Sequence, residues 1–406
     1  MILSSMTKLH DAGRRAVELL GLNSSMIAMV VLVVFIGLGE KMAERFLPLY
    51  LVALGGSTIA VGSLNAMDNL LSALYSFPGG WLSDRLGYKR ALILFTAAAM
   101  AGYLLVILVA TWWAVFVGAL FFISWTAITL PAVMSMVSKA VPKTKRTMGV
   151  TVHSFVRRIP MALGPVIGGA LIGALGRVAG IRAAFIAAFL LGAAAILFVR
   201  RFMEDDPPGE RKKTAGLLRS LRAITPALRN LLVSDILIRF AEQIPYAFVV
   251  LWVVDVTNHT ELQFGLLTTI EMATAMLVYL PVAWLADRST KKPFVLVTFC
   301  FFTLFPLVLL GARTFGMLVL AFIVRGLKEF GEPTRKALIM DLAPEEAKAL
   351  TFGAYYLVRD VIVSAAALSS AFLWNVSPAT NFLVAAGCGV LGTAWFAVFG
   401  KDAGKA

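Results

Sequence analysis

The sequence predicts an all-α integral membrane protein with twelve transmembrane helices, arranged as two parallel six-helix repeats. Of the 406 residues, 59% are hydrophobic and 15% are charged, whereas soluble domains carry about 25% charged residues. Apolar runs of about 20 residues recur along the chain, and this length crosses a hydrocarbon core of ~30 Å. The runs are continuous and do not alternate, which favours helices over the strands of a barrel.

The apolar runs also set the expected domain organisation. The one long polar stretch between them is 200–230, and six runs lie on each side of it. We therefore expect a cytoplasmic N-terminal segment at 1–25, a six-helix bundle at 26–199, a cytoplasmic linker at 200–230, a second bundle at 231–399 and a tail at 400–406. In chain order, the expected spans are roughly 26–53, 58–83, 91–110, 112–138, 148–175, 181–199, 231–255, 263–286, 293–312, 316–342, 350–374 and 381–399.

The basic excess of the chain follows its expected topology. The formal net charge is +14, and Lys and Arg gather in alternate loops, near residues 85–90, 139–146, 200–229 and 288–292. This asymmetry is typical of loops that stay on the cytoplasmic side of a membrane. We expect both termini and the linker on the cytoplasmic side of the cell inner membrane, with contacts to anionic lipids. No nucleic-acid partner is expected, because the basic residues follow the loops.

The two halves of the chain resemble each other. FPGGWLSDR (77–85) aligns with LPVAWLADR (280–288) at an offset of 203 residues, and each stretch ends a span and opens a basic loop. Six spans per half keep both halves in one orientation, as in parallel-repeat transporters with a binding site at the repeat interface. The sequence therefore predicts a secondary transporter that rocks one half against the other. Similar offsets superpose Glu40 on Glu242, Arg157 on Arg359, and Asp68 on Glu271.

The loop after the second span carries a recognisable motif. GGWLSDRLGYKRAL (79–92) resembles the signature loop of the major facilitator superfamily, G-x-L-[AS]-D-R-x-G-[RK]-[RK], with Tyr88 at a usually basic position. The resemblance implies a twelve-helix transporter that works by alternating access, with a charged latch on the cytoplasmic side. In this latch we expect Asp84 to accept hydrogen bonds from a helix N-terminus of the same half. The expected gate consists of Gly80, Asp84, Arg85, Gly87 and Lys89, with a degenerate second copy at Asp287 and Arg288.

A glycine-rich element in the fifth span bears on the direction of transport. In MALGPVIGGALIG (161–173), the residues Gly164, Pro165, Gly168 and Gly169 resemble the antiporter motif of drug–proton exporters in this superfamily. The resemblance implies proton-coupled efflux, and the small residues permit close contact between helices. Two features depart from those exporters: Pro160 replaces a further glycine, and residues 112–138 contain no Arg or Lys.

Many ionisable residues lie inside the expected spans. Each costs ~2.5–3.5 kcal/mol even on the most lenient insertion scale, so each is a candidate functional residue. The resemblance places nearly all of them on spans that line or flank a central cavity. We expect four carboxylates to serve proton coupling or gating: Glu40, Asp68, Glu242 and Glu271. We expect the substrate cavity to contain Glu44, Arg45, Arg157, Arg158, Arg325, Glu329, Glu332, Arg359 and Asp360.

The same charges could instead only hold helices together. Lys41 with Glu44, and Lys328 with Glu332, have opposite charges at the spacing of helical neighbours. An arginine offers a planar fork for a substrate carboxylate or phosphate, and a carboxylate whose surroundings change can carry a proton. Structural and functional roles both stay open at this point.

The leading interpretation is proton-coupled efflux of a small organic solute, and three alternatives stay open. GEKMAERF (39–46) resembles the E-x-x-E-R-F stretch of proton-coupled peptide transporters, with Lys41 at the first Glu position. This resemblance implies a proton-coupled importer of an anionic or zwitterionic solute. The second alternative is a metal-ion exporter, and the third is a non-transporting membrane scaffold or receptor.

Several classes of function are not expected. The chain contains no nucleophile–base set and no GxxxxGK[ST] loop, so we expect neither an enzyme nor an ATP-driven pump. Cys300 and Cys388 are isolated in the sequence, which indicates no metal or redox motif. We therefore expect no cofactor. We expect the chain to act as a monomer. Its expected partners are a small-molecule substrate, protons and membrane lipids.

Overall fold

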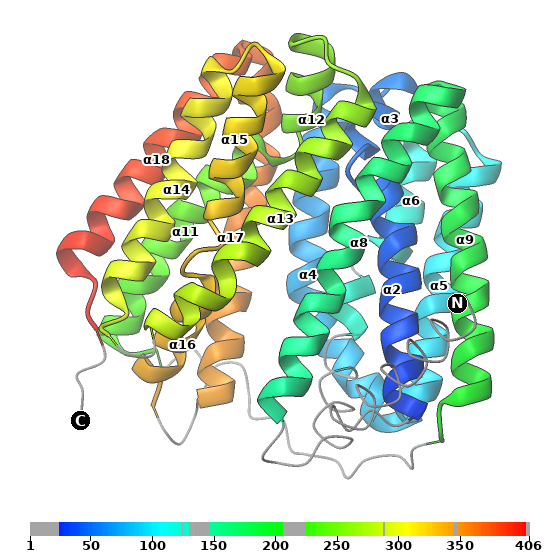
Figure 1. Cartoon of the computed structure of the whole chain (residues 1–406), viewed down its shortest axis with the longest axis horizontal. Coiled ribbons are helices and arrows are strands. Elements are labelled where there is room, and N and C mark those ends of the chain that lie inside the picture. Colours follow the sequence, from blue (N-terminus) through cyan, green and yellow to red (C-terminus); the bar gives the residue numbers. More distant parts are fainter. Residues whose placement is uncertain are drawn as a thin grey trace, which may run out of the picture.

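The computed structural model describes residues 24–123, 125–129, 133, 146–205, 224–286, 289–344 and 348–402. Within these residues every regular element is a helix, as the sequence predicts. Long helices run side by side between the two ends of the molecule (Figure 1). The chain leaves one end after Phe202 and enters again at Pro226, and we call this end the linker end.

The described helices follow the expected spans in order. Of the span expected at 112–138, residues 124, 130–132 and 134–138 lie outside the described part; each other expected span coincides with one helix or with consecutive shorter ones. The first half contains α2 (Ser24–Glu44), α3 (Leu47–Ala53), α4 (Thr58–Leu86), α5 (Tyr88–Leu108), α6 (Trp112–Phe122), α8 (Arg146–Leu175) and α9 (Arg177–Phe202). The second half contains α11 (Pro226–Tyr246), α12 (Val249–Leu251), the π-helix η2 (Trp252–Val256), α13 (Glu261–Ala286), α14 (Lys292–Gly311), α15 (Phe315–Leu327), α16 (Glu332–Leu342), α17 (Lys348–Val376) and α18 (Pro378–Phe399).

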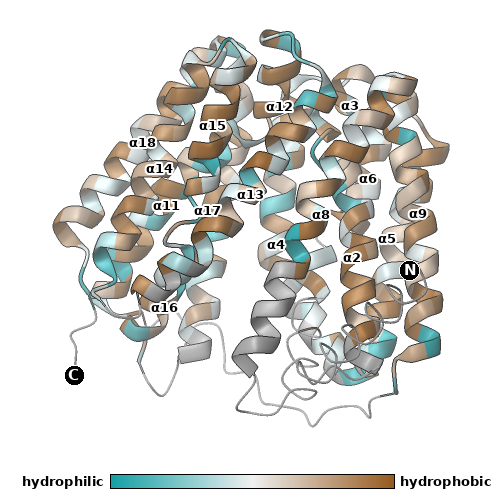
Figure 2. Cartoon of the chain, viewed as in Figure 1, coloured by the Kyte–Doolittle hydropathy of each residue, from teal (hydrophilic) through white to brown (hydrophobic). Residues whose placement is uncertain are grey.

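The composition of the helices is that of a membrane protein. Among the described residues, eight helices are long and apolar enough to cross a bilayer, and the bent run from α11 to η2 makes up to a ninth. Hydrophobic residues run along most of the helices (Figure 2), and many of them are exposed: Leu277 is 76% and Val398 71% exposed. Such side chains face lipid without cost. The exact count of twelve stays a prediction, because α2, α4 and the α15–α16 pair are not among these spans.

Three of the expected spans break inside the bundle. α2 ends before the turn Arg45–Phe46, and α11 ends before the turn Ala247–Phe248. These two turns lie 202 residues apart, the offset that the sequence repeat predicts. A third break, Lys328–Gly331, separates α15 from α16 where the sequence predicts one segment over 316–342. Pro333 lies in the first turn of α16, a position that tolerates proline because its missing N–H has no helical partner.

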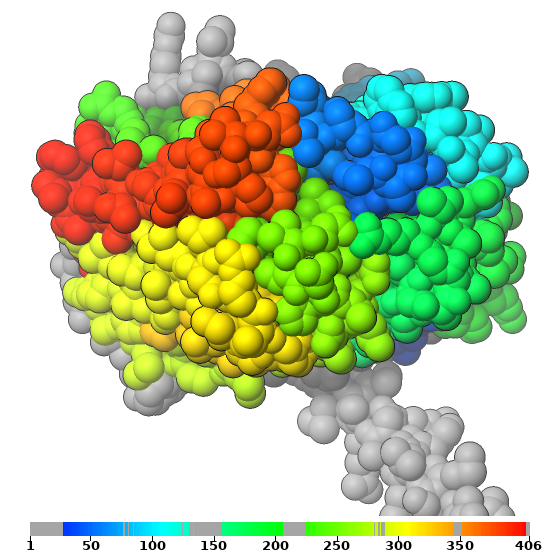
Figure 3. Space-filling model, turned by 90° about the horizontal axis from the view of Figure 1, so that it is seen from above, coloured from blue at the N-terminus to red at the C-terminus, as the bar shows by residue number. Residues whose placement is uncertain are grey.

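The two halves meet along two helix pairs, α8 with α13 and α4 with α17. At the end opposite the linker, α8 and α13 approach closely. A Cβ atom on Gly169 would lie 2.4 Å from the carbonyl oxygen of Glu261, and one on Gly265 would lie 2.4 Å from that of Pro165. Only glycine permits such contact between helix backbones. We call this the closed end; Figure 3 looks onto it and shows residues of both halves against each other.

Polar bonds also join the halves at the closed end. Arg177 pairs with Asp255 at 2.6 Å and with Glu261 at 3.0 Å. Elsewhere at the same end, the hydroxyl group of Thr58 donates to the side-chain oxygen of Asn375 at 2.6 Å. The ion pairs of Arg177 link α9 to the second half, and the Thr58–Asn375 hydrogen bond links α4 to α17.

Candidate functional site

Two small cavities lie around the charged part of α2. Cavity A, of about 30 Å³, is bordered by α2, by α8 and by residues between Trp125 and Val133. Cavity B, of about 50 Å³, lies between the halves and is bordered mainly by α2–α3, α4, α11–α12 and α15. Volumes of this size hold one or a few water molecules. Neither cavity is therefore large enough, in this conformation, for an organic solute of more than a few atoms.

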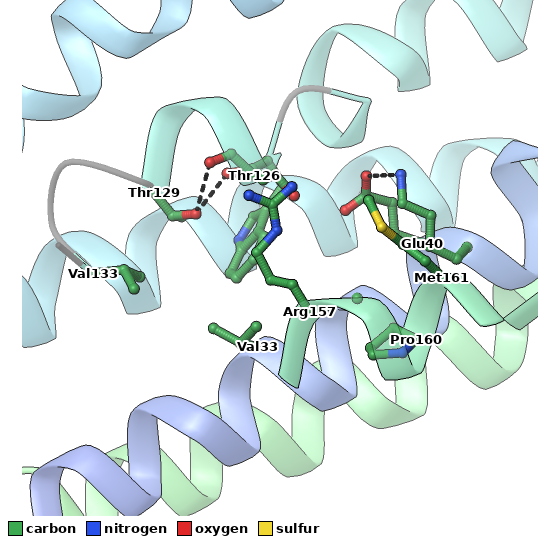
Figure 4. A pocket seen from close by; sticks show the side chains of 11 residues that line it. Val33, Glu40, Thr126, Thr129, Val133, Arg157, Pro160 and Met161 are labelled. Carbon is green, nitrogen blue, oxygen red and sulfur yellow. Dashed lines mark hydrogen bonds and ion pairs between the residues drawn. The ribbon is translucent and has the colours of Figure 1, made fainter. Parts of the chain in front are cut away.

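Cavity A contains an arginine without an ion pair. Arg157 projects from α8 toward Thr126, and Glu40 and Lys41 line the same cavity (Figure 4). Among the described residues, no carboxylate lies within ion-pair distance of the Arg157 guanidinium group. The Arg157 guanidinium group therefore lies in cavity A without a counter-charge at ion-pair distance among the described residues.

The neighbouring arginine joins the two halves. Arg158 pairs with Glu329, in the turn before α16, at 3.1 Å. Its guanidinium group also lies 5.2 Å from the centroid of the Tyr279 ring, a cation–π contact. Consecutive arginines of α8 therefore have different surroundings, one in a cavity and one in a bridge to the second half.

Lys41 pairs with both carboxylates of α2. Its ammonium nitrogen lies 3.1 Å from Glu40 Oε1 and forms a salt bridge with Glu44, so the predicted Lys41–Glu44 pair is confirmed. Glu40 is only 4% exposed, and its Oε2 has no hydrogen-bond partner among the described residues. One ammonium group neutralises one carboxylate. The three side chains therefore keep one negative charge when both carboxylates are ionised.

Cavity B brings together residues of both halves. The guanidinium groups of Arg45 and Arg325 lie 5.2 and 5.8 Å from the centroid of the same ring, that of Tyr246. Within the described part of the chain, Arg45 makes no ion pair, although Asp68 lines the same cavity. Asp68 accepts a hydrogen bond from the Ser72 hydroxyl at 3.4 Å and has no ion pair with a described residue. Cavity B thus repeats the pattern of cavity A, a carboxylate and an arginine that do not bind each other.

The second half contains a continuous chain of buried ion pairs. It begins at Glu271 of α13, which pairs with Arg325 at 3.3 Å and with Lys328 at 3.6 Å. Lys328 also binds Glu242 at 2.7 Å, and Glu242 binds Arg239 on its own helix. Both carboxylates are thereby compensated, unlike Asp68 in the first half.

The chain continues through α16 to α17. Arg239 lies 3.5 Å from Glu332, which binds Arg335 at 2.7 Å. Arg335 also pairs with Asp235, and Asp235 lies 3.4 Å from Arg359. Arg335 and Asp235 are each 1% exposed. The network therefore joins α11, α13, α15, α16 and α17 in surroundings of low dielectric constant, where such bonds are strong.

The structure corrects one predicted pair and adds two residues. Helical spacing predicts a pair between Lys328 and Glu332, and this prediction is wrong. The turn at 328–331 interrupts the helix, so Lys328 binds Glu242 and Glu271 of other helices, while Glu332 binds Arg335 of its own helix and Arg239 of α11. Arg335 is central to the network but absent from the predicted site. Its spacing of three residues from Glu332 is the sequence signal that could have indicated it. No spacing in the sequence indicates that Tyr246 lies beside Arg45.

The predicted site residues divide into two groups. Those that line cavity A or B are Glu40, Glu44, Arg45, Asp68, Arg157 and Arg325. Those found in ion pairs outside the two cavities are Arg158, Glu242, Glu271, Glu329, Glu332, Arg359 and Asp360. Their roles in transport stay predictions.

The predicted cytoplasmic gate lies at the linker end. Gly87 has a φ of 83°, a left-handed value that glycine adopts readily, and it forms the turn between α4 and α5. Lys89 pairs at 3.5 Å with Asp205, just beyond α9. Gly80 and Arg85 lie within α4, whereas the side chain of Asp84 and the residues Asp287 and Arg288 lie outside the described part. The latch itself stays a prediction.

The glycine-rich element of α8 lies against two other helices. A Cβ atom on Gly164 would lie 2.7 Å from the Cβ of Lys41, and one on Gly168 would lie 2.0 Å from the carbonyl oxygen of Met42. Gly169, on the next position, faces α13 as described above. The element therefore sets the distance between α8 and α2, and it positions Lys41 between cavities A and B.

Two helical halves with buried charges between them, in an apolar outer surface, are the architecture of a membrane transport protein. The sequence profile of the Major Facilitator Superfamily matches residues 29–238 and 231–405. The chain belongs to this superfamily and is a secondary transporter, not an enzyme. A comparison with curated protein sequences gives no match.

Solved transporter structures share this fold at low sequence identity. A POT family transporter in complex with 5-aminolevulinic acid has a TM-score of 0.76 and 13% identity, over 93% of this chain and 98% of that one. The nucleoside transporter NupG has a TM-score of 0.77 and 15% identity, over 93% and 100%. A bacterial homologue of the human lysosomal transporter Spinster, in an inward-facing and unoccupied conformation, has a TM-score of 0.71 and 12% identity, over 92% and 94%. At these identities the likeness concerns the fold alone.

Proposed function

We propose that this chain is a proton-coupled transporter of a small organic solute that carries an anionic group. The observation that supports the proposal is that Arg45 and Arg157 face cavities B and A without an ion pair among the described residues. A guanidinium group within a membrane is costly unless an anion satisfies it. A solute carboxylate or phosphate would be that anion, because a guanidinium group can bind either with two parallel hydrogen bonds.

The carboxylates near these arginines are the proposed proton sites. When all groups are ionised, the first half carries balanced charge around the cavities, with Glu40, Glu44 and Asp68 against Lys41, Arg45 and Arg157. A proton on Glu40 or on Asp68 leaves one arginine without a counter-charge. An anionic solute then restores neutrality in a medium where net charge is costly. Proton and solute would therefore bind together, which is symport.

A similar solved structure supports a solute of this chemical class. The POT family transporter binds 5-aminolevulinic acid, a molecule with one carboxyl and one amino group. In this chain, the carboxylate of such a solute would bind Arg45 or Arg157, and its amino group would bind Asp68. This corresponds to the importer that the GEKMAERF stretch indicates.

Proton-coupled efflux is the second candidate, and the glycine-rich element of α8 favours it. That element resembles the motif of drug–proton exporters and lies where α8 contacts α2 and α13. The contact with α13 joins the two halves, so it must move when the halves rock. In an antiporter, a cationic solute would compete with the proton for Asp68 or Glu40. The charge of the transported solute therefore separates the two candidates. No observation on the described residues favours the metal-ion exporter or the scaffold.

The orientation is part of the same proposal. The basic loops favour a cytoplasmic linker between bundles 26–199 and 231–399, cytoplasmic termini, and a monomer in the cell inner membrane. With that orientation, the closed end faces away from the cytoplasm. The described conformation would then be closed toward the outside of the cell.

Transport by the purified protein in proteoliposomes tests the proposal. Labelled anionic, zwitterionic and cationic solutes are offered under an imposed pH gradient, with a pH-sensitive dye inside the vesicles. We expect anionic or zwitterionic solutes to accumulate when the outside is acidic, and the lumen to acidify with them. Accumulation of cations alone, driven by an acidic lumen, would support the antiporter. If no solute moves and no proton flux follows under either gradient, the proposal is wrong.

A matched pair of variants links the effect to the cavity. Asp68→Asn should abolish accumulation driven by the pH gradient and retain solute exchange, because exchange needs no net proton movement. Asp341→Asn serves as the control, since Asp341 pairs with Lys291 at the linker end and lines neither cavity. Equal loss of gradient-driven transport and exchange in Asp68→Asn would assign Asp68 to solute binding or structure.

A further inference from the structure

We propose that cavities A and B together bind a solute with two anionic groups, most simply a small aliphatic dicarboxylate, and that each anionic group binds together with one proton. This inference rests on the proposed function. It specifies the chemical class of the solute and the number of protons that move with each solute molecule. The observation that carries it is that each of the two cavities contains one arginine and one carboxylate.

The two sets have the same chemistry. Cavity A contains Arg157 and Glu40, and cavity B contains Arg45 and Asp68. Among the described residues, neither arginine has an ion pair, Asp68 has none, and Glu40 has one oxygen, Oε2, without a partner. Each cavity therefore offers one place for a proton and one guanidinium group for an anion.

The charge balance indicates two protons rather than one. Glu40 and Glu44 share the single ammonium group of Lys41. A proton on Glu40 leaves a complete Lys41–Glu44 pair and an uncompensated Arg157. A proton on Asp68 likewise leaves Arg45 uncompensated. With both protons in place, the site carries two positive charges, and a dianion neutralises it.

The surroundings of the two carboxylates permit this assignment. The charged and titratable groups around Glu40 are Lys41, Glu44, Asp68, Arg157 and the phenol of Tyr103. Those around Asp68 are Glu44, Lys41, Glu40, Arg45, Arg325 and Tyr246. Asp68 has no ion pair in the described structure and accepts only the long Ser72 hydrogen bond. Glu40 is bound only by Lys41, which it shares with Glu44, so a proton on Glu40 leaves Lys41 with Glu44 as its partner.

The geometry limits the length of the solute. Glu40 borders cavity A, Glu44 borders cavity B, and the two are one helical turn apart on α2, about 6 Å. The Lys41–Glu44 pair lies between the cavities, since Lys41 lines A and Glu44 lines B. The spacing of the two cavities along α2 is our basis for the expected separation of the two anionic groups, about one helical turn, and the Lys41–Glu44 pair must shift aside before one solute can bind both arginines. A short dicarboxylate has this length, whereas a monoanion can satisfy only one arginine.

Competition in proteoliposomes tests the inference. Succinate, glutarate and adipate are compared with the monocarboxylates of equal carbon number as inhibitors of uptake of a labelled dicarboxylate. We expect at least one dicarboxylate to compete about tenfold or more better, as expected for one added charge-assisted hydrogen-bonded group. The proton-to-solute ratio, measured from the gradients at which net flux reverses, should be two for the dicarboxylate.

Variants assign each group to its cavity. Arg157→Gln should remove the preference for dicarboxylates while monocarboxylates still compete, and Glu40→Gln should lower the proton-to-solute ratio from two to one. Arg229→Gln, an exposed arginine near the linker end, is the control and should change neither quantity. Because Arg157→Gln could fail to fold, Arg157→Lys is measured as well: it keeps the charge without the bidentate fork, and it should weaken dicarboxylate binding more than monocarboxylate binding.

The outcomes distinguish this inference from the proposed function. If monocarboxylates move with one proton and compete as well as dicarboxylates, the inference is wrong and the proposed function stands. If Arg157→Gln and Arg157→Lys weaken both classes equally, Arg157 does not bind a second anionic group and the inference is also wrong. If no anion moves at all, both proposals fail.

Discussion

The guanidinium group of Arg177 lies 2.6 Å from the carboxylate of Asp255 and joins the two halves at the closed end. Its second partner, Glu261 at 3.0 Å, begins the helix that packs along α8. Arg177 belongs to the first half and both partners belong to the second, so these bonds must break whenever the closed end opens. The side chain of Arg177 is 37% exposed, and exposed pairs contribute only ~0.2–1 kcal/mol each.

Removal of this bridge should favour opening of the closed end. In Arg177→Gln we expect the closed state to lose about 1 kcal/mol, a roughly fivefold shift in population. Cross-linking of Thr58→Cys with Asn375→Cys by a short thiol reagent reports this shift, because these side chains are hydrogen-bonded across the halves. The background carries Cys300→Ser and Cys388→Ser. The cross-linking rate should fall in Arg177→Gln.

A second cysteine pair controls for reactivity. Ser377 and Thr380 lie at the same end but within one half, with their hydroxyl oxygens 2.8 Å apart. Cross-linking of Ser377→Cys with Thr380→Cys should be unaffected by Arg177→Gln. An equal change in both pairs would show a general effect on thiol reactivity and contradict the role of Arg177 as a bridge between halves.

The contact of α8 with α2 should tolerate no side chain at Gly168. A Cβ atom there would lie 2.0 Å from the carbonyl oxygen of Met42, so Gly168→Ala must push the helices apart. We expect a loss of about 1–3 kcal/mol in the free energy of unfolding, the usual cost of overpacking, with reduced transport. Thermal unfolding in detergent and uptake in proteoliposomes are the measurements.

Gly173, on the same helix, provides the matched control. A Cβ atom on Gly173 would have no atom within 4 Å, and alanine favours a helix over glycine by roughly 1 kcal/mol. Gly173→Ala should therefore retain transport and match or exceed the stability of the unmodified protein. If Gly168→Ala behaves in the same way, the close contact between α8 and α2 is not required.

The ion-pair network of the second half should be essential for stability. Arg335 binds both Glu332 and Asp235 and is 1% exposed. Arg335→Ala leaves buried carboxylates without their main partner, which costs ~3–5 kcal/mol. Lys336 also contacts Glu332, at 3.5 Å, but its side chain is 49% exposed, so Lys336→Ala should cost under about 1 kcal/mol. Unfolding in detergent compares the two, and equal losses would contradict the importance of burial.

The fold could be predicted from the sequence because each membrane span is determined by its own apolar run of residues. Each apolar run must satisfy its own backbone hydrogen bonds, so it forms a helix whatever its neighbours are. The offset of about 202 residues predicts the repeat, and the structure places the turns at Arg45–Phe46 and Ala247–Phe248 at that offset. The break at Lys328–Gly331 was not predicted, although Gly331 and Pro333 lie at it, because a proline within a membrane span does not by itself end the helix.

The partners of the charged residues were harder to predict. The Lys41–Glu44 pair follows from spacing, because both residues lie on one unbroken helix. The same rule fails for Lys328 and Glu332, because a turn separates them: Lys328 binds Glu242 of α11, and Glu332 binds Arg335 within α16. Repeat symmetry also fails here: Glu242 binds Lys328 and Arg239, whereas its counterpart Glu40 binds only Lys41 among the described residues.

The sequence by itself determined the membrane class, the order of the helices, the repeat and the set of buried charges, because hydropathy and motif spacing are local properties of the chain. Only the tertiary structure decided which charges compensate each other. Arg359 and Arg157 are repeat counterparts, yet Arg359 pairs with Asp235 and Asp360 while Arg157 faces cavity A without a described ion pair. The physical reason is that an ion pair depends on the distance between side chains of different helices, and helix packing sets that distance.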